Sequence, residues 1–319
     1  MPSTVRIAFI GCGSLANRMH YPSLAEMDDV ELVACCDLDE AKLGATAERY
    51  GIARRYTDYR RMLREVECEA VYAVMPTLEP FPDLVVELVG AGKHVFLEKP
   101  PGVTLAACER MAEAAEASGV KTMVGFNRRF APVVEESRRR VVESGGVSQM
   151  MAEFHKDMLS SGPYWGVSIL VTDVIHVVDL LRHVCGEPTE VVSFPERRFA
   201  DWTNVYSALV AFDSGATGIL SANRAAGSRY ERFELHGRGI SSYVRAPEEA
   251  QIWREGQREP EVLRGEELAG SADPRRSFGY FAESRHFVNC IVAGQRPLTD
   301  LSDALKTMRL IAAIEVGRG

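Results

Sequence analysis

Short apolar runs alternate with longer amphipathic segments over the first 125 residues of the chain. The apolar runs are continuous, as in strands that are covered on both faces. The pattern predicts strands at residues 5–10, 30–36, 70–75, 94–97 and 121–126, and helices at 14–27, 39–50, 81–91 and 104–118. Strands that alternate with helices of this length indicate βαβ units and a parallel sheet.

The pattern changes after Phe126. Alternating apolar and polar positions predict strands at residues 148–156, 205–212, 216–223, 232–236 and 241–245. Such alternation is typical of an antiparallel sheet with one solvated face. Helical patterns occupy residues 132–144, 169–184, 278–293 and 301–316, and the polar stretch 256–274 is interpreted as a loop.

The length of 319 residues favours two domains over one core. The predicted boundaries are 1–125 for the first domain and 126–300 for the second, with a closing helix at 301–319 that packs back on the first. A net charge of -8 without a basic stripe argues against nucleic-acid binding. The chain starts without a secretory signal pattern and contains no apolar run of about 18 residues, so a cytoplasmic protein is expected.

The seven cysteines are scattered and mostly lie in apolar stretches. Because no C-x-x-C pair occurs, buried, reduced thiols are expected. The histidines outside residue 176 also lack the spacing of metal ligands. We therefore predict no metal.

A G-x-G-x-x-A sequence follows the first predicted strand and opens the first helix, which is the context that this dinucleotide-binding motif requires. Gly11 permits the tight turn, Gly13 allows the backbone to approach the pyrophosphate, and Ala16 allows close packing of helix on strand. The helix amino terminus, with Ser14 and Leu15, would face the phosphates. The first domain is therefore expected to be a doubly wound Rossmann domain.

Asp37 ends the second predicted strand, where an acidic residue binds the adenosine ribose hydroxyls. Its charge would repel a 2′-phosphate, which favours NAD over NADP. Alternatively, Asp37 caps the helix at 39–50, although Asp39 can do the same.

The segment Glu98-Lys99-Pro100 ends the strand at 94–97. Ligands bind at the carboxyl ends of parallel strands in this architecture. A lysine can act as an acid or base there, because burial or a nearby cation lowers the pKa of a lysine. The alternative is an ordinary surface lysine after a strand.

Together, the glycine motif, Asp37, the segment at 92–100 and the run from Val124 to Phe130 resemble the Gfo/Idh/MocA family of oxidoreductases. The resemblance covers nearly the whole chain. It implies NAD(P)-dependent oxidation or reduction of a sugar, inositol or related polyol. It also implies a second, α+β domain with a large, mostly antiparallel open sheet, through which family members often form dimers or tetramers.

The resemblance also implies a second catalytic element on the helix at 169–184. His176 matches the family histidine and Asp179 the acidic residue that often follows it. The family has an Asp four residues before this histidine, but this chain has Thr172 there and Asp173 three residues before it. A carboxylate at Asp173 can still share the face of His176. Alternatively, His176 is a core histidine.

Pro76 and Thr77 resemble the family segment that lines the nicotinamide pocket, although Glu79-Pro80 follows where the family has a histidine. Glu98 is a further candidate for contact with the cofactor. The candidates for substrate binding are weaker, and each has a packing or salt-bridge alternative: Arg128, Arg129, Lys156, Tyr164 and Trp165.

Two other functions remain open on the same scaffold. One is an enzyme that uses NAD transiently for glycoside cleavage or elimination. The other is a regulator that senses a dinucleotide, which is suggested by Thr172 in place of the family Asp and by the missing histidine near Pro80. The intact Lys99 argues against a regulator. Net production or consumption of NADH would distinguish the oxidoreductase from these two alternatives.

Overall fold

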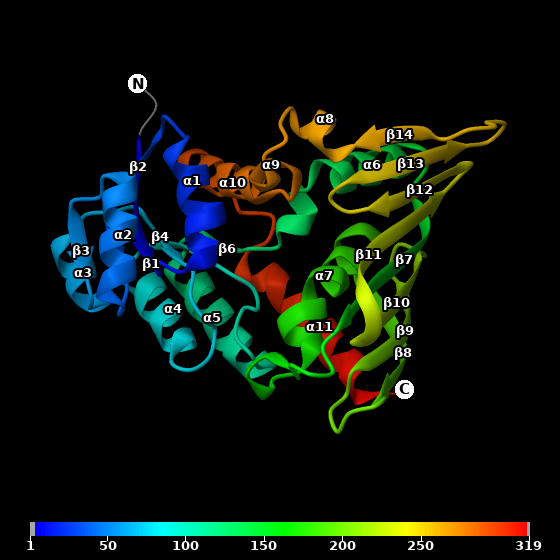
Figure 1. Ribbon diagram of the computed structural model, residues 1–319, viewed down its shortest axis with the longest axis horizontal. Helices are drawn as coiled ribbons and strands as arrows, with labels where there is room; N and C mark the ends of the chain where they lie inside the picture. The colour runs from blue at the N-terminus through cyan, green and yellow to red at the C-terminus, as the bar shows by residue number, and fades with distance from the viewer. Residues whose placement is uncertain (1–3, 318–319) are drawn as a thin grey trace. The chain divides into compact units, whose positions relative to one another are not determined.

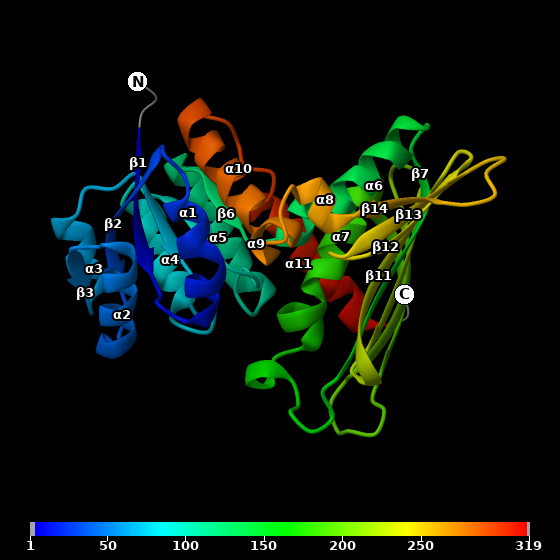
Figure 2. The same cartoon turned by 45° about the horizontal axis from the view of Figure 1, so that its top comes forward.

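The computed structural model describes residues 4–317 (Figures 1 and 2). The chain forms two compact units, neither of which is continuous in sequence. Unit 1 contains the chain up to Phe126 and the segment Tyr280–Leu305, and unit 2 contains Asn127–Gly279 and the chain from Lys306 onward.

Unit 1 is built on a parallel sheet of six strands in the order β3-β2-β1-β4-β5-β6. The strands are β1 Val5–Ile10, β2 Val30–Cys36, β3 Arg54–Tyr56, β4 Ala70–Ala73, β5 His94–Leu97 and β6 Thr122–Val124. The helices are the π-helix η1 Ala16–His20, α1 Tyr21–Ala25, α2 Glu40–Tyr50, α3 Tyr59–Glu65, α4 Phe81–Gly90, α5 Leu105–Ser118 and α10 Tyr280–Ala293. The doubly wound parallel sheet is confirmed.

Local sequence signals explain most of these boundaries. Asp39 caps α2 by accepting bonds from the backbone of Ala41 and Lys42, and Thr104 caps α5. Gly119 ends α5 in the left-handed conformation, as expected of a residue at that position. The sequence missed β3 and α3, which are short and exposed on much of their surface.

An aromatic cluster joins α10 to the sheet of unit 1. Tyr72 on β4 stacks on Phe96 of β5, with ring centroids 4.5 Å apart. Phe287 of α10 meets both rings edge-on, at 5.9 and 6.0 Å. All three rings are fully buried, so the late segment of the chain completes the core of unit 1.

Unit 2 contains an eight-stranded sheet in the order β14-β13-β12-β11-β7-β10-β9-β8. All neighbouring pairs are antiparallel except β7 and β10. The strands are β7 Val147–Asp157, β8 Pro188–Glu196, β9 Val205–Phe212, β10 Thr217–Asn223, β11 Ala225–Gly237, β12 Ile240–Arg245, β13 Glu249–Arg254 and β14 Glu261–Arg264. The mostly antiparallel sheet is confirmed.

Helices cover one face of this sheet, as the edge-on view in Figure 2 shows for α6 and α7. On β7, Met150, Ala152 and Phe154 are buried on this inner face, whereas Glu153 and His155 on the outer face are more exposed. The helical elements of unit 2 are η2 Asn127–Phe130, α6 Pro132–Glu143, η3 Tyr164–Gly166, the π-helix η4 Leu170–Val174, α7 Ile175–Cys185, α8 Gly265–Ala269 and α9 Pro274–Ser277.

The interpretation of residues 256–274 as a loop is wrong in part, because they contain β14 and α8. The strand β14 has only four residues and pairs with β13 through backbone hydrogen bonds at the sheet edge. Only one of its four side chains is buried, so no alternation marked it in the sequence.

The units also divide the chain differently from the predicted boundaries. The helix α10 falls in unit 1, although the prediction assigned residues 126–300 to the second domain. The helix α11, Leu301–Val316, was expected to pack on the first domain, but its residues from Lys306 onward belong to unit 2. There, the hydroxyl of Ser193 on β8 donates a hydrogen bond to the carbonyl of Ile314.

All seven cysteines are buried and unpaired by disulfides, as expected of reduced thiols. No helix within residues 4–317 is both long and apolar enough to cross a membrane.

Candidate functional site

The glycine-rich turn joins β1 to η1 and depends on Gly11. This residue has φ +106°, and a Cβ atom there would lie 2.1 Å from the carbonyl oxygen of Val74. Only glycine therefore fits. Gly13 is different, because a Cβ atom there would meet nothing within 4 Å. The open space beside its backbone fits the close approach of a pyrophosphate.

Asp37 follows β2 and faces this turn. Its Oδ2 accepts a hydrogen bond of 2.6 Å from the backbone of Cys12, and its Oδ1 accepts one of 2.9 Å from the backbone of Asp39. Since Asp39 caps α2, Asp37 is not needed for capping. Its carboxylate is held beside the glycine turn, which is the position expected for a ligand of the adenosine ribose.

Thr77 follows the carboxyl end of β4, which neighbours β1 at the point where the strand order reverses. Its hydroxyl is buried and has no hydrogen-bond partner among the described residues. A buried hydroxyl without a partner is costly, and a ligand would satisfy it. Pro76 beside it is exposed. The turn, Asp37 and Thr77 together fit a bound NAD.

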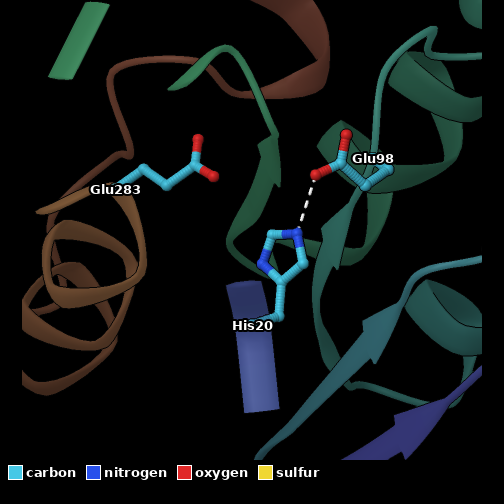
Figure 3. A group of neighbouring side chains, drawn as sticks. All are labelled: His20, Glu98 and Glu283. Carbon is cyan, nitrogen blue, oxygen red and sulfur yellow. Dashed lines mark hydrogen bonds and ion pairs between the residues drawn. The ribbon is translucent and has the colours of Figure 1, made fainter. Parts of the chain in front are cut away.

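Glu98 and Lys99 follow β5, and the carboxylate of Glu98 points toward His20 (Figure 3). Its Oε1 lies 2.7 Å from Nε2 of His20, and its Oε2 accepts a hydrogen bond of 3.2 Å from the backbone amide of Lys99. A Cβ atom at Gly125 would lie 3.0 Å from Oε1, so the carboxylate is tightly enclosed. These contacts position Lys99, which is itself half-buried.

Glu283 of α10 lies near His20 and Glu98 (Figure 3). All three residues are buried, and one potential ligand atom from each lies within 4.8 Å of the others. The rings of Phe96 and Tyr280 pack against His20, at 5.2 and 5.6 Å. Sequence spacing could not reveal this group, because its members come from three distant segments. The absence of a metal remains a prediction.

His176 lies in the first turn of α7, directly after the π-helix η4, and is 8% exposed. Asp173 in η4 forms an ion pair with Arg224, whose Nε lies 2.8 Å from Oδ2 of the carboxylate. The hydroxyl of Thr172 donates a hydrogen bond of 3.1 Å to the carbonyl of Ser168. Both candidate partners of His176 thus have other bonds, and their catalytic roles remain predictions.

The two arginines after β6 form buried ion pairs within unit 2. Nε of Arg128 lies 2.7 Å from Oε1 of Glu231, and NH2 of Arg129 lies 2.5 Å from Oδ1 of Asp179. These contacts give both side chains a structural role inside the unit. A role in substrate binding remains a prediction for each.

Lys156 lies near the carboxyl end of β7 and contacts Tyr164, which is followed in the chain by Trp165. Nζ of Lys156 donates a hydrogen bond of 2.7 Å to the hydroxyl of Tyr164. Tyr164 and Trp165 are 43% and 52% exposed, and Trp165 has φ +56°. Exposed aromatic rings of this kind are suited to cover a sugar ring.

Neither His20 nor Arg224 was predicted from the sequence as a site residue. His20 gave only a weak signal, as one histidine in the helix after the glycine turn. Arg224 could have been found, because it continues the inward-facing alternation of Leu220 and Ala222 past the end of β10. That alternation predicts a buried arginine, which needs a carboxylate partner.

Comparison with known proteins agrees with this geometry. Residues 5–126 match the family model described as "Oxidoreductase family, NAD-binding Rossmann fold", and residues 142–241 match the GFO/IDH/MocA C-terminal domain. The chain is 27% identical to the D-apiose dehydrogenase of Paraburkholderia graminis, over 96% of this chain and 85% of the relative. It is also 27% identical to the myo-inositol 2-dehydrogenase of Thermotoga maritima, over 96% and 94% of the two chains.

Solved structures show the same fold. A dehydrogenase from Chromobacterium violaceum superposes with a TM-score of 0.87 at 26% identity, covering 98% of this chain and 95% of that one. Levoglucosan dehydrogenase in complex with NADH and L-sorbose also gives 0.87, at 19% identity, over 98% and 96% of the two chains. With both of its domains matched, the chain belongs to the GFO/IDH/MocA family of oxidoreductases.

Proposed function

We propose that this protein is an NAD-dependent dehydrogenase or reductase that acts on a carbinol carbon of a sugar, inositol or related polyol. The observation that carries the proposal is the placement of Lys99. It follows β5 at the carboxyl edge of the NAD-binding sheet, and its backbone is bonded to the buried carboxylate of Glu98. The curated relatives named above are sugar and inositol dehydrogenases.

Residues of unit 1 would hold the cofactor. The backbone from Gly11 to Ala16, with Ser14 and Leu15, would face the pyrophosphate, and Asp37 would accept bonds from the ribose hydroxyls. The hydroxyl of Thr77 would bond to the ligand at the end of β4. When bound, NAD supplies the hydride acceptor or donor of the reaction.

Lys99 would then transfer the proton of the reacting hydroxyl group. In oxidation its amine takes the proton as the carbinol becomes a carbonyl, and in reduction its ammonium returns a proton to the oxygen. His176 would orient or protonate a hydroxyl group of the substrate, with Thr172 or Asp173 as its neighbour. Lys156, Tyr164 and Trp165 would bind the remaining hydroxyl groups and the ring of the substrate.

The proposal includes assembly and location. A homodimer or homotetramer would form through the outer face of the unit 2 sheet, and the exposed apolar side chains on β8, β9 and β12 support this: Phe194, Leu209 and Tyr243. We place the protein in the cytoplasm, in line with its reduced cysteines.

The test is a turnover assay with the purified protein, NAD or NADP, and a panel of sugars, inositols and sugar acids, followed by NADH absorbance. Lys99→Met is expected to reduce turnover at least ~100-fold while NADH still binds, because general acid–base catalysis contributes about that much. Lys93→Met, which changes a lysine at the opposite end of β5, is the control and should keep its activity. NADH binding without redox turnover on any substrate would favour the non-redox enzyme or the regulator.

A further inference from the structure

Charged side chains gather on the inner face of the unit 2 sheet, where β7 and β10 end and β11 begins. We call them the cationic cluster, and its members are Lys156, Arg224, Arg229 and Arg128 with the carboxylates Asp173 and Glu231. Each carboxylate lies within 4 Å of two of the cations.

Arg224 anchors the cluster. Its side chain is fully buried. Nε forms an ion pair with Asp173, and NH1 donates a hydrogen bond of 2.5 Å to the carbonyl of Phe154. The guanidinium carbon lies 4.3 Å from the centroid of the Phe154 ring. The remaining nitrogen, NH2, is buried without a hydrogen-bond partner among the described residues. Such a donor calls for an acceptor, which a ligand can supply.

The charges of the cluster do not balance. Asp173 lies 2.8 Å from Arg224 and 3.8 Å from Lys156. Glu231 lies 2.7 Å from Arg128 and 3.3 Å from Arg229. Two carboxylates are thus shared among four cations. The more weakly paired members are Lys156 and Arg229, whose side chains are also the most accessible, at 26% and 58%.

The excess of positive charge is confined to the inner face. On the outer face of β11, Arg232 lies beside two carboxylates, Glu153 and Glu234. Arg229 lies on the inner face, with its guanidinium carbon 5.4 Å from the centroid of the Phe154 ring. The positive charge therefore belongs to one place and not to the strand as a whole.

We propose that the cationic cluster binds an acidic group of the substrate, so that the substrate is a polyhydroxylated carboxylate, such as an aldonate or uronate, rather than a neutral sugar. This inference rests on the proposed function and narrows it. A guanidinium fork matches a carboxylate in shape and charge. Lys156 lies 3.8 Å from Asp173, which stands three residues before His176. An acid group held by Lys156 and Arg229 would therefore lie near the segment that carries His176.

The test compares aldonates and uronates with the corresponding neutral polyols and aldoses, in the full-length protein with NAD. Arg229→Gln is the informative variant, because its exposed side chain can change without disturbing the core. We expect KM for the acids to rise about tenfold or more, with kcat little changed and any activity on neutral sugars unaffected. Arg232→Gln, on the opposite face of the same strand, is the matched control and should leave both classes unchanged.

Gluconate and tartrate binding to the NADH-loaded protein, measured by calorimetry, gives a readout besides turnover. Binding should weaken in Arg229→Gln and with added salt. Efficient turnover of neutral sugars that Arg229→Gln leaves unchanged, with no binding of the acids, would overturn the inference and keep the proposed function. If acids bind in a manner that depends on Arg229 but no substrate gives redox turnover, the proposed function is wrong and the anion site is supported.

Discussion

The carboxylate of Glu98, a residue predicted to contact the cofactor, also has neighbours within the protein. It contacts His20 and the backbone of Lys99, and it is only 6% exposed. We therefore propose that Glu98 is a positioning residue for Lys99. His20 in turn belongs to the helix that follows the glycine turn, so hydrogen bonds connect that helix to Lys99.

Glu98→Gln keeps the shape of the side chain but removes its charge. We expect kcat to fall about tenfold, because the contact with His20 weakens and Lys99 is held less firmly. The Kd for NADH should stay the same, which fluorescence titration can measure. A weaker Kd with unchanged kcat would show that Glu98 binds the cofactor, as the sequence predicted.

Gly11 and Gly13 form a matched pair for a second prediction. Gly11→Ala should lower Tm and abolish NADH binding, because its Cβ would clash with the backbone at Val74 and its φ is positive. Gly13→Ala should leave Tm unchanged, since space is open there, but weaken NADH binding by obstructing the pyrophosphate. Equal Tm values for the two variants would contradict this assignment.

Single residues were predictable from sequence where a local backbone rule decides them. Gly11 and the cap at Asp39 follow from the geometry of a turn and of a helix terminus. The neighbours of Glu98 do not, because His20 and Glu283 reach it from segments that only the tertiary fold brings together. The partner of Asp173 was missed for the same reason.

At the scale of the element, α7 carries a histidine that makes stability depend on pH. Burial, helped by the nearby Arg129, lowers the pKa of His183 to about 3. The unfolded chain binds a proton below about pH 6.5, whereas the folded protein does not until about pH 3. The free energy of unfolding should therefore decrease as the pH falls through this range and be unaffected above it.

His183→Gln is expected to reduce this pH dependence. The free energy of unfolding is measured in urea at pH 8 and at pH 5. Its decrease between the two pH values should be smaller in the variant than in the parent. The value at pH 8 serves as the internal control. Identical losses in the two proteins would show that His183 is not the group responsible.

Elements with strong periodicity were predictable, and exposed edge elements were not. The strands at 5–10, 30–36 and 94–97 and the helix at 301–316 occur with the predicted bounds. The sequence missed β8, β13 and β14, all of which lie toward the edges of the large sheet. The edge strands β8 and β14 each pair with one neighbour through backbone hydrogen bonds, which leave little trace in side-chain polarity.

At the scale of the whole molecule, each unit depends on segments far apart in the chain. The core of unit 1 needs Phe287, which closes the aromatic cluster of Tyr72 and Phe96. A prediction of domains from sequence order alone could not show this, because α10 follows the whole sheet of unit 2 along the chain.

A fragment that ends at Phe126 should therefore be unstable, since losing a buried phenylalanine alone costs about 3–5 kcal/mol. The same fragment joined to residues 280–305 by a glycine-rich linker should unfold at a higher urea concentration. Circular dichroism is the suitable probe, because all three tryptophans lie in the other unit. Equal midpoints would show that the first 126 residues form a complete core.

The burial of all seven thiols has a practical value for spectroscopy. The natural protein should behave toward maleimide dyes much like a cysteine-free background. One cysteine introduced at Ser228, which is exposed and adjoins Arg229, would then carry a fluorophore to the edge of the cationic cluster. Its emission would report the arrival of an acidic ligand in real time, without any need for turnover.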